Sequence, residues 1–468
     1  MSTRDDGPTR PLDPGDGPTR PLDPGPGDDP TRPLDAGRPA PTQPLRPGRR
    51  MTRALRGALA DTRPLQVPAY RRLFTAGIVT VVGAQLTVVA VPAQIFALTG
   101  SSAYVGLTGL FGLVPLVVFG LWGGAIADAV DRRLLLLVTG SGIALTSLAL
   151  WVCAAGGVGS VWVVLALFAV QSAFLAVNQP TRSAVIPRLM PVEQVPAANA
   201  LNMTVVQAGA VAGPLLAGVL IPVVGLPTLY LLDALALLST LWATWRLPPV
   251  PPAAVDGRRQ RAGVREVVAG FRYAALHKVL LVSFLIDVVA MGFGMPRVVF
   301  PEAAERTFGD PRGGGLALGL LFAAIPLGMV VAGLLSGWLH RVRRQGVAVT
   351  AAICVWGGGV AAFGLTRSLW LAVLCLAVAG AGDLVSSVYR SSMLQTVATD
   401  EMRGRMQGVF IVVVAGGPRL ADLWHGPAAT AFGPGPAATA GGVAVILGAL
   451  AVVARYREFW RFRAAAPG

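Results

Sequence analysis

The stretch Gly120-Leu-Trp-Gly-Gly-Ala-Ile-Ala-Asp-Ala-Val-Asp-Arg-Arg-Leu134 lies between two long apolar runs, where the chain leaves a membrane and turns back into it. Gly120, Gly124 and Asp128 follow one another at a spacing of four residues, so they share one face of a helix. Glycines on such a face allow a neighbouring helix to approach closely. Asp128 also precedes Arg132 by four residues, a spacing at which a carboxylate and a guanidinium can pair. The stretch therefore predicts a charged turn between two packed membrane helices.

The composition is that of a membrane protein. Apolar residues make up 54% of the 468 residues and charged residues 13%, with a mean hydropathy of +0.62, whereas soluble chains carry roughly 25% charged residues. The formal net charge of +15 would also suit a nucleic-acid-binding protein. The arginines, however, stand in short clusters between apolar runs, which is the pattern of membrane loops. We therefore expect a lipid bilayer as the environment and no nucleic-acid partner.

A regular succession of apolar runs begins at Tyr70. A spanning helix needs about 20 mostly apolar residues, and this rule predicts an all-α membrane protein with twelve transmembrane helices. The expected spans are 73–97, 104–126, 134–155, 160–180, 200–222, 227–246, 278–299, 315–338, 347–366, 369–389, 408–430 and 435–455. The eleventh run is interrupted by the segment 416–419 and by Asp422.

The arginine clusters predict the orientation of the chain. If twelve helices alternate, one side of the membrane carries Arg132 and Arg133, Arg182 and Arg188, the arginines of 258–272, Arg341 to Arg344, Arg403 and Arg405, and those of 455–463. The opposite loops carry Arg306, Arg312 and Arg367. Basic residues concentrate in cytoplasmic loops. Both termini are therefore expected in the cytoplasm.

Residues 1–66 are rich in Pro, Gly, Asp and Arg and almost devoid of large apolar side chains, so we predict a disordered tail. The hexapeptide Pro-Thr-Arg-Pro-Leu-Asp occurs in it at 8–13, 18–23 and 30–35. One interpretation is that the repeats are docking or phosphorylation sites for a protein partner, at Thr9, Thr19 and Thr31. The alternative is a low-complexity expansion that has no partner.

A segment at 248–277 divides the apolar runs into two sets of six, at 70–247 and 278–455. The segment begins with prolines and basic residues, and in 263–277 apolar residues recur at helical spacing. This pattern predicts a cytoplasmic linker with an amphipathic helix on the membrane surface. The chain is thus expected to hold two six-helix halves, followed by a basic cytoplasmic tail at 456–468.

The Gly-x-x-x-Asp pattern and basic end of the loop at 120–134 resemble the signature loop between helices two and three of the major facilitator superfamily of transporters. The family usually has a basic residue where Ala129 stands and a glycine where Asp131 stands. The resemblance implies the major facilitator fold, with a substrate path between the two halves near the bilayer midplane. It also implies a part in gating for Gly120, Gly124, Asp128, Arg132 and Arg133. The alternative is a charged turn that only sets the orientation of the chain.

The fifth apolar run contains a second motif, made of Gly209, Gly213, Pro214 and Gly218. A Gly-x-x-x-Gly pair forms a close contact face, and the proline removes a backbone donor, so the helix can kink there. The run is similar to the motif that marks exporting antiporters in this superfamily. Ordinary helix packing is the alternative.

Three of the carboxylates inside apolar runs are candidates for function, because charged residues are costly there. Asp287 stands nine residues beyond Lys278, about 13 Å along a helix axis, and therefore near mid-membrane. Burial in a low-dielectric cavity favours the protonated form of a carboxyl group, which suits exchange of protons for substrate. We predict Asp287 as the proton-coupling residue, with Asp383 and Asp233 as further candidates. For each, the alternative is a buried structural hydrogen-bonding group.

Other polar residues on apolar runs are candidates for the substrate path. They are Gln85, Gln94, Gln171, Asn178, Asn202, Gln207 and Arg297, to which Met291 adds an apolar lining. Simple packing is the alternative for Met291. Arg419 and Asp422, three residues apart, share a helix face and are interpreted as a structural pair.

Further segments extend the resemblance over about residues 70–455. They are Val91–Gln94, Arg297–Pro301, Phe322–Gly328, Met393–Thr396 and Gly404–Gly408. These segments resemble the siderophore and secretion-type exporters of the major facilitator superfamily. The resemblance implies proton-driven export of a siderophore or another small amphiphilic molecule across the cell (inner) membrane.

Two other functions remain open at the level of sequence. The same fold can act as a proton-coupled importer, and a non-transporting receptor or scaffold would act through the tail repeats. An enzyme would need a nucleophile with its base or a metal-ligand cluster near one membrane face, and the sequence shows neither pattern. We expect a monomer whose partners are the substrate and protons, with no cofactor and no metal.

Overall fold

The computed structural model describes residues 61–250 and 272–462. Within these ranges it does not describe the side chains of residues 121–125, 127–129, 400–401, 403–412 and 415. The tail repeats and most of the predicted amphipathic helix lie outside the described residues. Of that helix, residues 272–276 are described and are helical.

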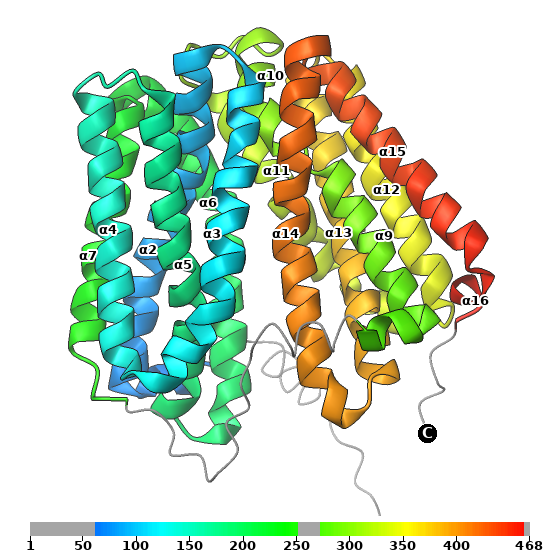
Figure 1. Ribbon diagram of the computed structural model, residues 1–468, viewed down its shortest axis with the longest axis horizontal. Helices are drawn as coiled ribbons and strands as arrows, with labels where there is room; N and C mark the ends of the chain where they lie inside the picture. The colour runs from blue at the N-terminus through cyan, green and yellow to red at the C-terminus, as the bar shows by residue number, and fades with distance from the viewer. Residues whose placement is uncertain (1–60, 251–271, 463–468) are drawn as a thin grey trace, which may run out of the picture. The chain divides into compact units, whose positions relative to one another are not determined.

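The regular elements of the described residues are helices (Figure 1). The long helices are α2 (Pro68–Thr99), α3 (Ser102–Ala129), α4 (Arg132–Ala155), α5 (Val161–Leu189), α6 (Val195–Val224), α7 (Leu226–Trp245), α9 (Lys278–Gly294), α11 (Leu316–Leu334), α12 (Gln345–Leu365), α13 (Leu369–Val397), α14 (Asp400–Phe432) and α15 (Pro434–Arg455). The short helices are η1 (Arg63–Gln66), η2 (Val192–Gln194), η3 (Arg297–Val299), α10 (Phe300–Arg306), η4 (Ser336–Arg341) and α16 (Arg457–Trp460).

Eleven spans of the described chain are long and apolar enough to cross a membrane. Many large apolar side chains on these spans are exposed, among them Leu145, Trp162 and Leu447. An exposed apolar surface of this extent is stable in lipid, where exposed hydrocarbon is not in contact with water. The prediction of an all-α membrane protein is therefore confirmed. α14 is not among the eleven, and it is one unbroken helix through the interruption at 416–419.

The long helices form two groups according to their contacts. In the first group, α2 packs on α6 and α7, α4 packs on α5 and α7, and α3 packs on α5. In the second group, α9 packs on α14 and α15, α12 packs on α13 and α15, and α11 packs on α13. The groups meet along two helix pairs, α3 with α14 and α6 with α11. We refer to α2–α7 as the first group and to α9–α15 as the second group.

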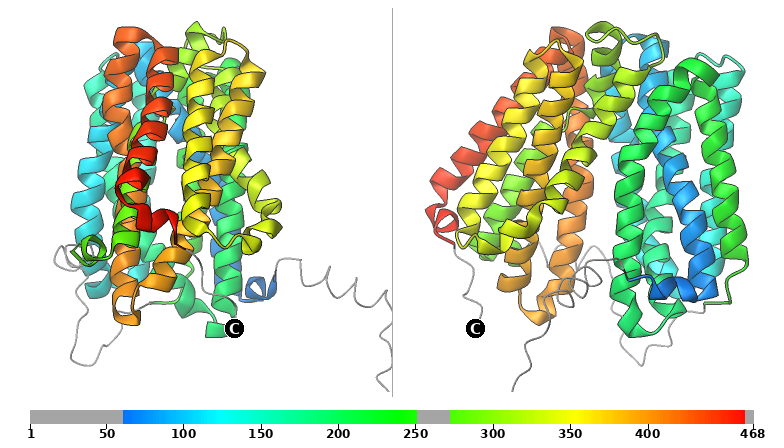
Figure 2. Two further views of the ribbon diagram at one scale, coloured as in Figure 1. Left: turned by 90° about the vertical axis from the view of Figure 1, so that its right-hand side faces the viewer. Right: turned by 180° about the vertical axis from the view of Figure 1, so that it is seen from behind.

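Glycines allow the two groups to meet closely at one end. A Cβ on Gly426 of α14 would lie 2.6 Å from the Ser102 carbonyl oxygen and 2.9 Å from the Cα of Gly106 on α3. A Cβ on Gly319 of α11 would lie 2.8 Å from the Cα of Gly218 on α6. We call this end, which carries these four glycines and Ser102, the closed end. Seen from behind, the ribbons of the two groups approach at the closed end and spread apart toward the other end (Figure 2).

The seventh spanning helix ends earlier than the sequence predicts. The expected span reaches residue 299, but α9 ends at Gly294 and a short turn, η3, follows. Pro296 has no N–H, so it cannot donate to the Gly292 carbonyl four residues earlier. The indole N–H of Trp424 donates to that carbonyl instead, at 2.8 Å. The break turns the chain and places Arg297 away from the axis of α9.

The signature loop is a tight connection between α3 and α4. Asp131 is the N-cap of α4, and its carboxylate accepts a hydrogen bond from the Arg133 N–H at 2.8 Å. Arg132 donates to the Ala184 carbonyl of α5, and Arg133 donates to the Trp245 carbonyl of α7. Asp131, one of the two positions that depart from the family pattern, therefore caps the start of the next helix.

Not every contact predicted for this loop is formed. Gly120 is exposed, and a Cβ there would meet no described neighbour within 4 Å, so the predicted close helix contact is not formed at this glycine. The surroundings of Gly124 and the side chain of Asp128 are not described by the structure. The pairing of Asp128 with Arg132 therefore stays a prediction.

The predicted basic tail begins with a packed segment. In α16, Phe459 is 1% exposed, and its carbonyl lies so close to Gly346 that a Cβ on that glycine would clash with it. Lys278 and Glu458 form an exposed ion pair with an N–O distance of 2.7 Å. α16 therefore packs against α12 and α9 of the second group.

Candidate functional site: a cavity between two helix groups beside a row of charged residues

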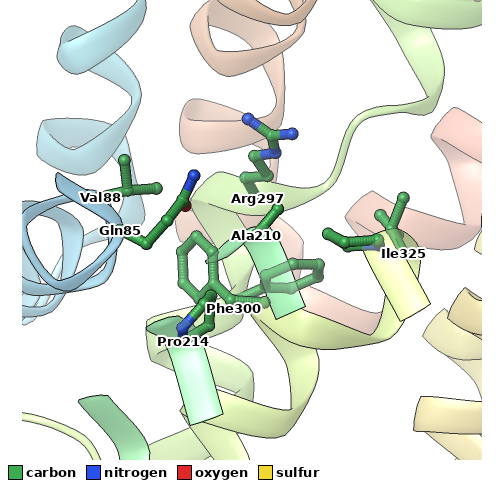
Figure 3. Close-up of a pocket in the computed structure, with 9 residues that line it drawn as sticks. Gln85, Val88, Ala210, Pro214, Arg297, Phe300 and Ile325 are labelled. Atoms are coloured by element: carbon green, nitrogen blue, oxygen red, sulfur yellow. The ribbon is translucent and has the colours of Figure 1, made fainter. Parts of the chain in front are cut away.

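A cavity of about 140 Å³ lies between the first and second helix groups (Figure 3). Its lining residues are Gln85, Val88, Ala210, Pro214, Arg297, Phe300, Phe322, Ile325 and Pro326. They come from α2 and α6 on one side and from η3, α10 and α11 on the other. Three of them, Gln85, Pro214 and Arg297, are residues that the sequence predicts for transport.

The break after α9 supplies the charged and aromatic parts of the lining. Arg297 stands in η3 and its side chain remains accessible, as expected for a group that projects into open space. Figure 3 shows the Gln85 amide and the Arg297 side chain extending away from Pro214. The Phe300 ring meets the Phe322 ring edge to face, with ring centroids 5.2 Å apart. The cavity thus combines one cation, one amide and a firmly packed aromatic wall.

Charged side chains form a row in the second group, beginning at the buried residue Asp287. Asp287 of α9 forms an ion pair with Arg390 of α13, and their side chains are 1% and 4% exposed. Asp383 lies seven residues before Arg390 on α13, on nearly the same helix face, and interacts electrostatically with Asp287, Arg390 and Arg297. The cavity residue Arg297 therefore belongs to the same row as the predicted proton-coupling residues.

The row continues from Arg297 to α14. Arg297 interacts electrostatically with Asp422, and Asp422 interacts with Arg419. We call the set Asp287, Arg390, Asp383, Arg297, Asp422 and Arg419 the charge row. It holds three acidic and three basic residues, so it is neutral when all six are ionised. Neutrality limits the cost of burying these groups.

Arg419 connects the charge row with the first group. Its guanidinium donates to the Thr108 carbonyl of α3 at 3.4 Å and lies 5.4 Å from the ring centroid of Phe168 on α5. Arg419 and Asp422, which are both described, do not form a direct ion pair. They interact electrostatically at longer range. The predicted pair therefore interacts at longer range than a direct ion pair, and Arg419 also reaches across to the other group of helices.

Asp233, the third predicted carboxylate, lies away from the cavity. It is 2% exposed on α7, inside the first group. Its Oδ2 accepts hydrogen bonds from Thr87 at 2.7 Å and from Ser147 at 2.8 Å, and Ser147 in turn accepts from Gln171 at 2.9 Å. This arrangement joins α2, α4, α5 and α7, which favours a structural role.

The glycines of the helix-five motif lie on α6 and approach two different helices. A Cβ on Gly209 or Gly213 would clash with Val81 or Gln85 of α2. A Cβ on Gly218 would lie 2.8 Å from the Gly315 carbonyl oxygen just before α11. Pro214, between these contacts, lines the cavity. The motif therefore packs α6 within its own group and also against the other group.

The remaining predicted substrate-path residues do not line this cavity. The Gln94 amide oxygen accepts from Tyr230 at 2.7 Å, and Asn178 donates to Thr139 at 2.8 Å, so both are held inside the first group. Asn202 and Gln207 are half-buried on α6. Met291 is 5% exposed, and a Cβ on Gly417 would lie 2.5 Å from its Cβ, so Met291 packs against α14.

Sequence reasoning missed Arg390 and the aromatic wall. Arg390 could have been predicted as a candidate, because it follows Asp383 by seven residues, at the end of the same predicted helix. Phe300 and Phe322 lie in segments that resemble the exporters, but aromatic residues are common throughout apolar runs, so the sequence does not indicate that the two rings form one wall. No group of His, Cys, Asp or Glu among the described residues is arranged to hold a metal ion.

Comparisons with known proteins agree with this architecture. Residues 59–461 match the sequence model of a major facilitator family described as transmembrane secretion effector. The enterobactin exporter EntS of Citrobacter koseri is 29% identical over 410 residues, covering 86% of this chain and 94% of the relative. The EntS protein of Escherichia coli O81 is 28% identical with the same coverage.

Solved structures show the same fold at low sequence identity. The nucleoside transporter NupG (D323A mutant) superposes with a TM-score of 0.69 at 13% identity, covering 83% of this chain and 100% of that one. A bacterial homologue of the human lysosomal transporter Spinster, solved inward-facing and unoccupied, gives a TM-score of 0.64 at 17% identity, covering 86% of this chain and 97% of that one. The chain is thus a multi-pass membrane transporter and not an enzyme, and it belongs to the transmembrane secretion effector family of the major facilitator superfamily.

Proposed function

We propose that this protein exports a small amphiphilic molecule, of the siderophore type or similar, from the cytoplasm in exchange for protons. The observation that carries the proposal is the charge row, which contains the buried Asp287–Arg390 ion pair and includes Arg297, a lining residue of the cavity between the two helix groups. Arg297 lines the cavity and also interacts electrostatically with Asp383, so binding of substrate in the cavity and binding of a proton at the carboxylates can influence each other. The relatives named as enterobactin exporters support the direction and the kind of substrate.

The proposed topology has twelve spans in two six-helix halves. The eleven candidate spans and α14, which is 33 residues long, make up the twelve. The two groups of helices correspond to the halves. The loops at the end opposite to the closed end carry Arg132, Arg133, Arg341, Arg343 and Arg344, and basic loops favour the cytoplasm.

In this orientation both termini lie in the cytoplasm of a protein of the inner membrane, and the closed end faces away from it. The conformation is then one that receives substrate from the cytoplasm. The transport unit is a monomer.

The proposed coupling centre is Asp287, with Asp383 as the second carboxylate of the same site. Arg390 pairs with Asp287 and is also within electrostatic range of Asp383. When a proton binds one of the two carboxylates, Arg390 can pair with the other, which stays ionised. The cluster can therefore take up a proton while the buried Arg390 cation keeps an anionic partner. Arg297 links this cluster to the cavity, where Gln85, Phe300 and Phe322 form the wall against an amphiphilic substrate.

Proton release from inverted membrane vesicles tests the proposal. Vesicles that contain the full chain are given an acid-inside gradient, and a catecholate siderophore (enterobactin), a cationic amphiphile and a neutral amphiphile are added in turn. We expect one of these probes to collapse the gradient in wild type and to have no effect in Asp287→Asn. Asp233→Asn is the matched control, because it removes a buried carboxylate outside the charge row.

Each outcome has a defined meaning. Gradient collapse that persists in Asp287→Asn overturns the assignment of Asp287 and transfers the test to Asp383→Asn. Substrate that leaves the vesicle together with protons identifies an importer and overturns export. No response to any probe, with the chain folded and inserted, contradicts proton-coupled transport of these substrate classes.

A further inference from the structure

A buried carboxylate joins the two helix groups at the closed end. Glu302 of α10 is 2% exposed, and its Oε2 accepts a hydrogen bond from the Ser102 hydroxyl of α3 at 2.5 Å. Its Oε1 accepts from Arg306 at 2.6 Å, and Arg306 also donates to the Gly100 carbonyl, between α2 and α3, at 3.0 Å. Glu302 and Arg306 belong to the second group, whereas Ser102 and Gly100 belong to the first.

Physical chemistry makes these contacts stronger than the others at this end. Hydrogen bonds to ionised groups are roughly twice as strong as neutral ones. Ser102 is the first residue of α3, so the carboxylate also lies at a helix N-terminus, where the helix dipole favours negative charge. The hydrogen bonds that Thr430 makes with Ser101 and with the Ala103 N–H, by contrast, join neutral groups.

The ion pair itself does not cross between the groups. Glu302 and Arg306 stand four residues apart on the same short helix. When the groups separate, the pair stays intact, whereas the bonds to Ser102 and Gly100 and the contact of Arg306 with the Phe96 ring of α2 are lost. The carboxylate therefore keeps its countercharge during opening, which avoids the large penalty of an unpaired buried charge.

We propose that Glu302 and Arg306 form a latch that holds the closed end shut, and that release of Ser102 and Gly100 from this latch is a step in opening that end. The inference rests on the proposed function, because it takes the two helix groups to separate there during transport. Neither residue belongs to the charge row or lines the cavity, so the latch controls conformation separately from substrate and proton binding.

Disulfide formation across the closed end tests the latch. The hydroxyl oxygens of Ser101 and Thr430 lie 3.1 Å apart on opposite groups, so Ser101→Cys and Thr430→Cys report closure. The reporter is built into the full chain in membranes, with Cys153, Cys354 and Cys375 replaced by serine. We expect Glu302→Gln to slow the initial rate of disulfide formation several-fold. Glu305→Gln, the same chemical change three residues along α10, should leave the rate unchanged.

Two further variants keep the test decisive if Glu302→Gln does not fold. Arg306→Gln removes the bond to Gly100, and Ser102→Ala removes the bond to Glu302 from the other side. Both should slow the reaction as well. Equal rates in Glu305→Gln and in every folded latch variant overturn the proposal. Because the readout needs neither substrate nor a proton gradient, a failed transport assay and a failed latch are separate results.

Discussion

At the scale of single residues, the buried carboxylates of this protein differ in what surrounds them. Asp287 faces a guanidinium on another helix, whereas Asp233 receives hydroxyl groups from Thr87 and Ser147. A carboxylate that faces a cation gains or loses a proton together with a change in an ion pair. A carboxylate held by hydroxyl groups mainly connects helices.

Replacement of Asp233 by asparagine should leave transport coupling intact. Asparagine keeps the shape and still accepts from Thr87 and Ser147 through its carbonyl oxygen. We expect a loss of about 1 kcal/mol in the free energy of unfolding, because the hydrogen bonds to a charged acceptor become neutral. Thermal unfolding in detergent measures the stability, and proton release in vesicles measures the coupling. Loss of coupling in a stable Asp233→Asn protein would contradict the structural role.

Removal of the Arg390 cation should be severely destabilising. Arg390→Gln leaves Asp287 buried without its ion-pair partner, at an expected cost of about 3–5 kcal/mol. The double variant Asp287→Asn with Arg390→Gln should recover much of this loss, since no unpaired charge remains. Unfolding of the two single variants and the double variant forms a complete thermodynamic cycle. Additive effects of the two substitutions would show that the two side chains do not interact.

At the scale of elements, the break between α9 and η3 positions the cavity. Pro296 leaves the Gly292 carbonyl without a helical donor, and Trp424 of α14 supplies the missing N–H. Trp356 of α12 donates in the same way to the Ala290 carbonyl at 3.2 Å. Two indoles from other helices thus stabilise an irregular backbone that would otherwise be unstable inside a membrane.

Loss of the Trp424 donor should therefore weaken the fold. Trp424→Phe keeps an aromatic ring beside Phe293 but leaves the Gly292 carbonyl unsatisfied, at a cost of about 1–3 kcal/mol. The effect should appear as a lower melting temperature of the purified protein. Trp370→Phe is the control, because Trp370 is 70% exposed at the start of α13 and should tolerate the change.

The contact between α6 and α11 depends on glycine. Gly218→Ala places a Cβ 2.8 Å from the Gly315 carbonyl oxygen and 2.9 Å from the Cα of Gly319, distances that backbone atoms cannot relieve without moving the helices. We expect the two helices to separate and export to fall, while the chain still inserts. A distance measurement between spin labels on α6 and α11 checks this result. Gly358→Ala, at a position with open space, should behave as wild type.

At the scale of the whole molecule, every element that we propose to act in transport lies within residues 61–462. The cavity, the charge row and the closed end are all formed by described helices. The family match covers nearly the same range, at 59–461. The tail at 1–60 therefore stands outside every element to which transport is attributed.

Deletion of residues 1–60 should accordingly leave transport unchanged. The measurement is substrate-dependent proton release in vesicles that contain equal amounts of the full and the shortened chain. A shortened chain that inserts but no longer transports would assign a necessary role to the tail, and would favour the interpretation of its repeats as docking sites. Unchanged transport argues against a receptor that acts through its tail alone.

The positions of most helices, the family and the packing glycines of α6 could be predicted from the sequence because each is encoded locally. Apolar runs of sufficient length must span or be buried, and glycines at a spacing of four create a contact face wherever the helix packs. The predicted spans agree with the observed helices within a few residues, except at 278–299 and where α5, α6, α13 and α14 extend beyond the apolar run. These helices are longer than their apolar runs, because hydropathy indicates which residues lie in lipid and does not indicate where a helix ends.

Only the tertiary structure decided which of these residues act together. Asp287 and Arg390 stand on different helices, and nothing in their local sequence indicates that they form a pair. The same is true of Glu302, which accepts from Ser102, and of Gln85 and Arg297, which line one cavity only because the two groups of helices pack together. The reason is physical: hydropathy determines that a helix enters the membrane, but in lipid the rotation and partners of that helix depend on packing and polar contacts between helices.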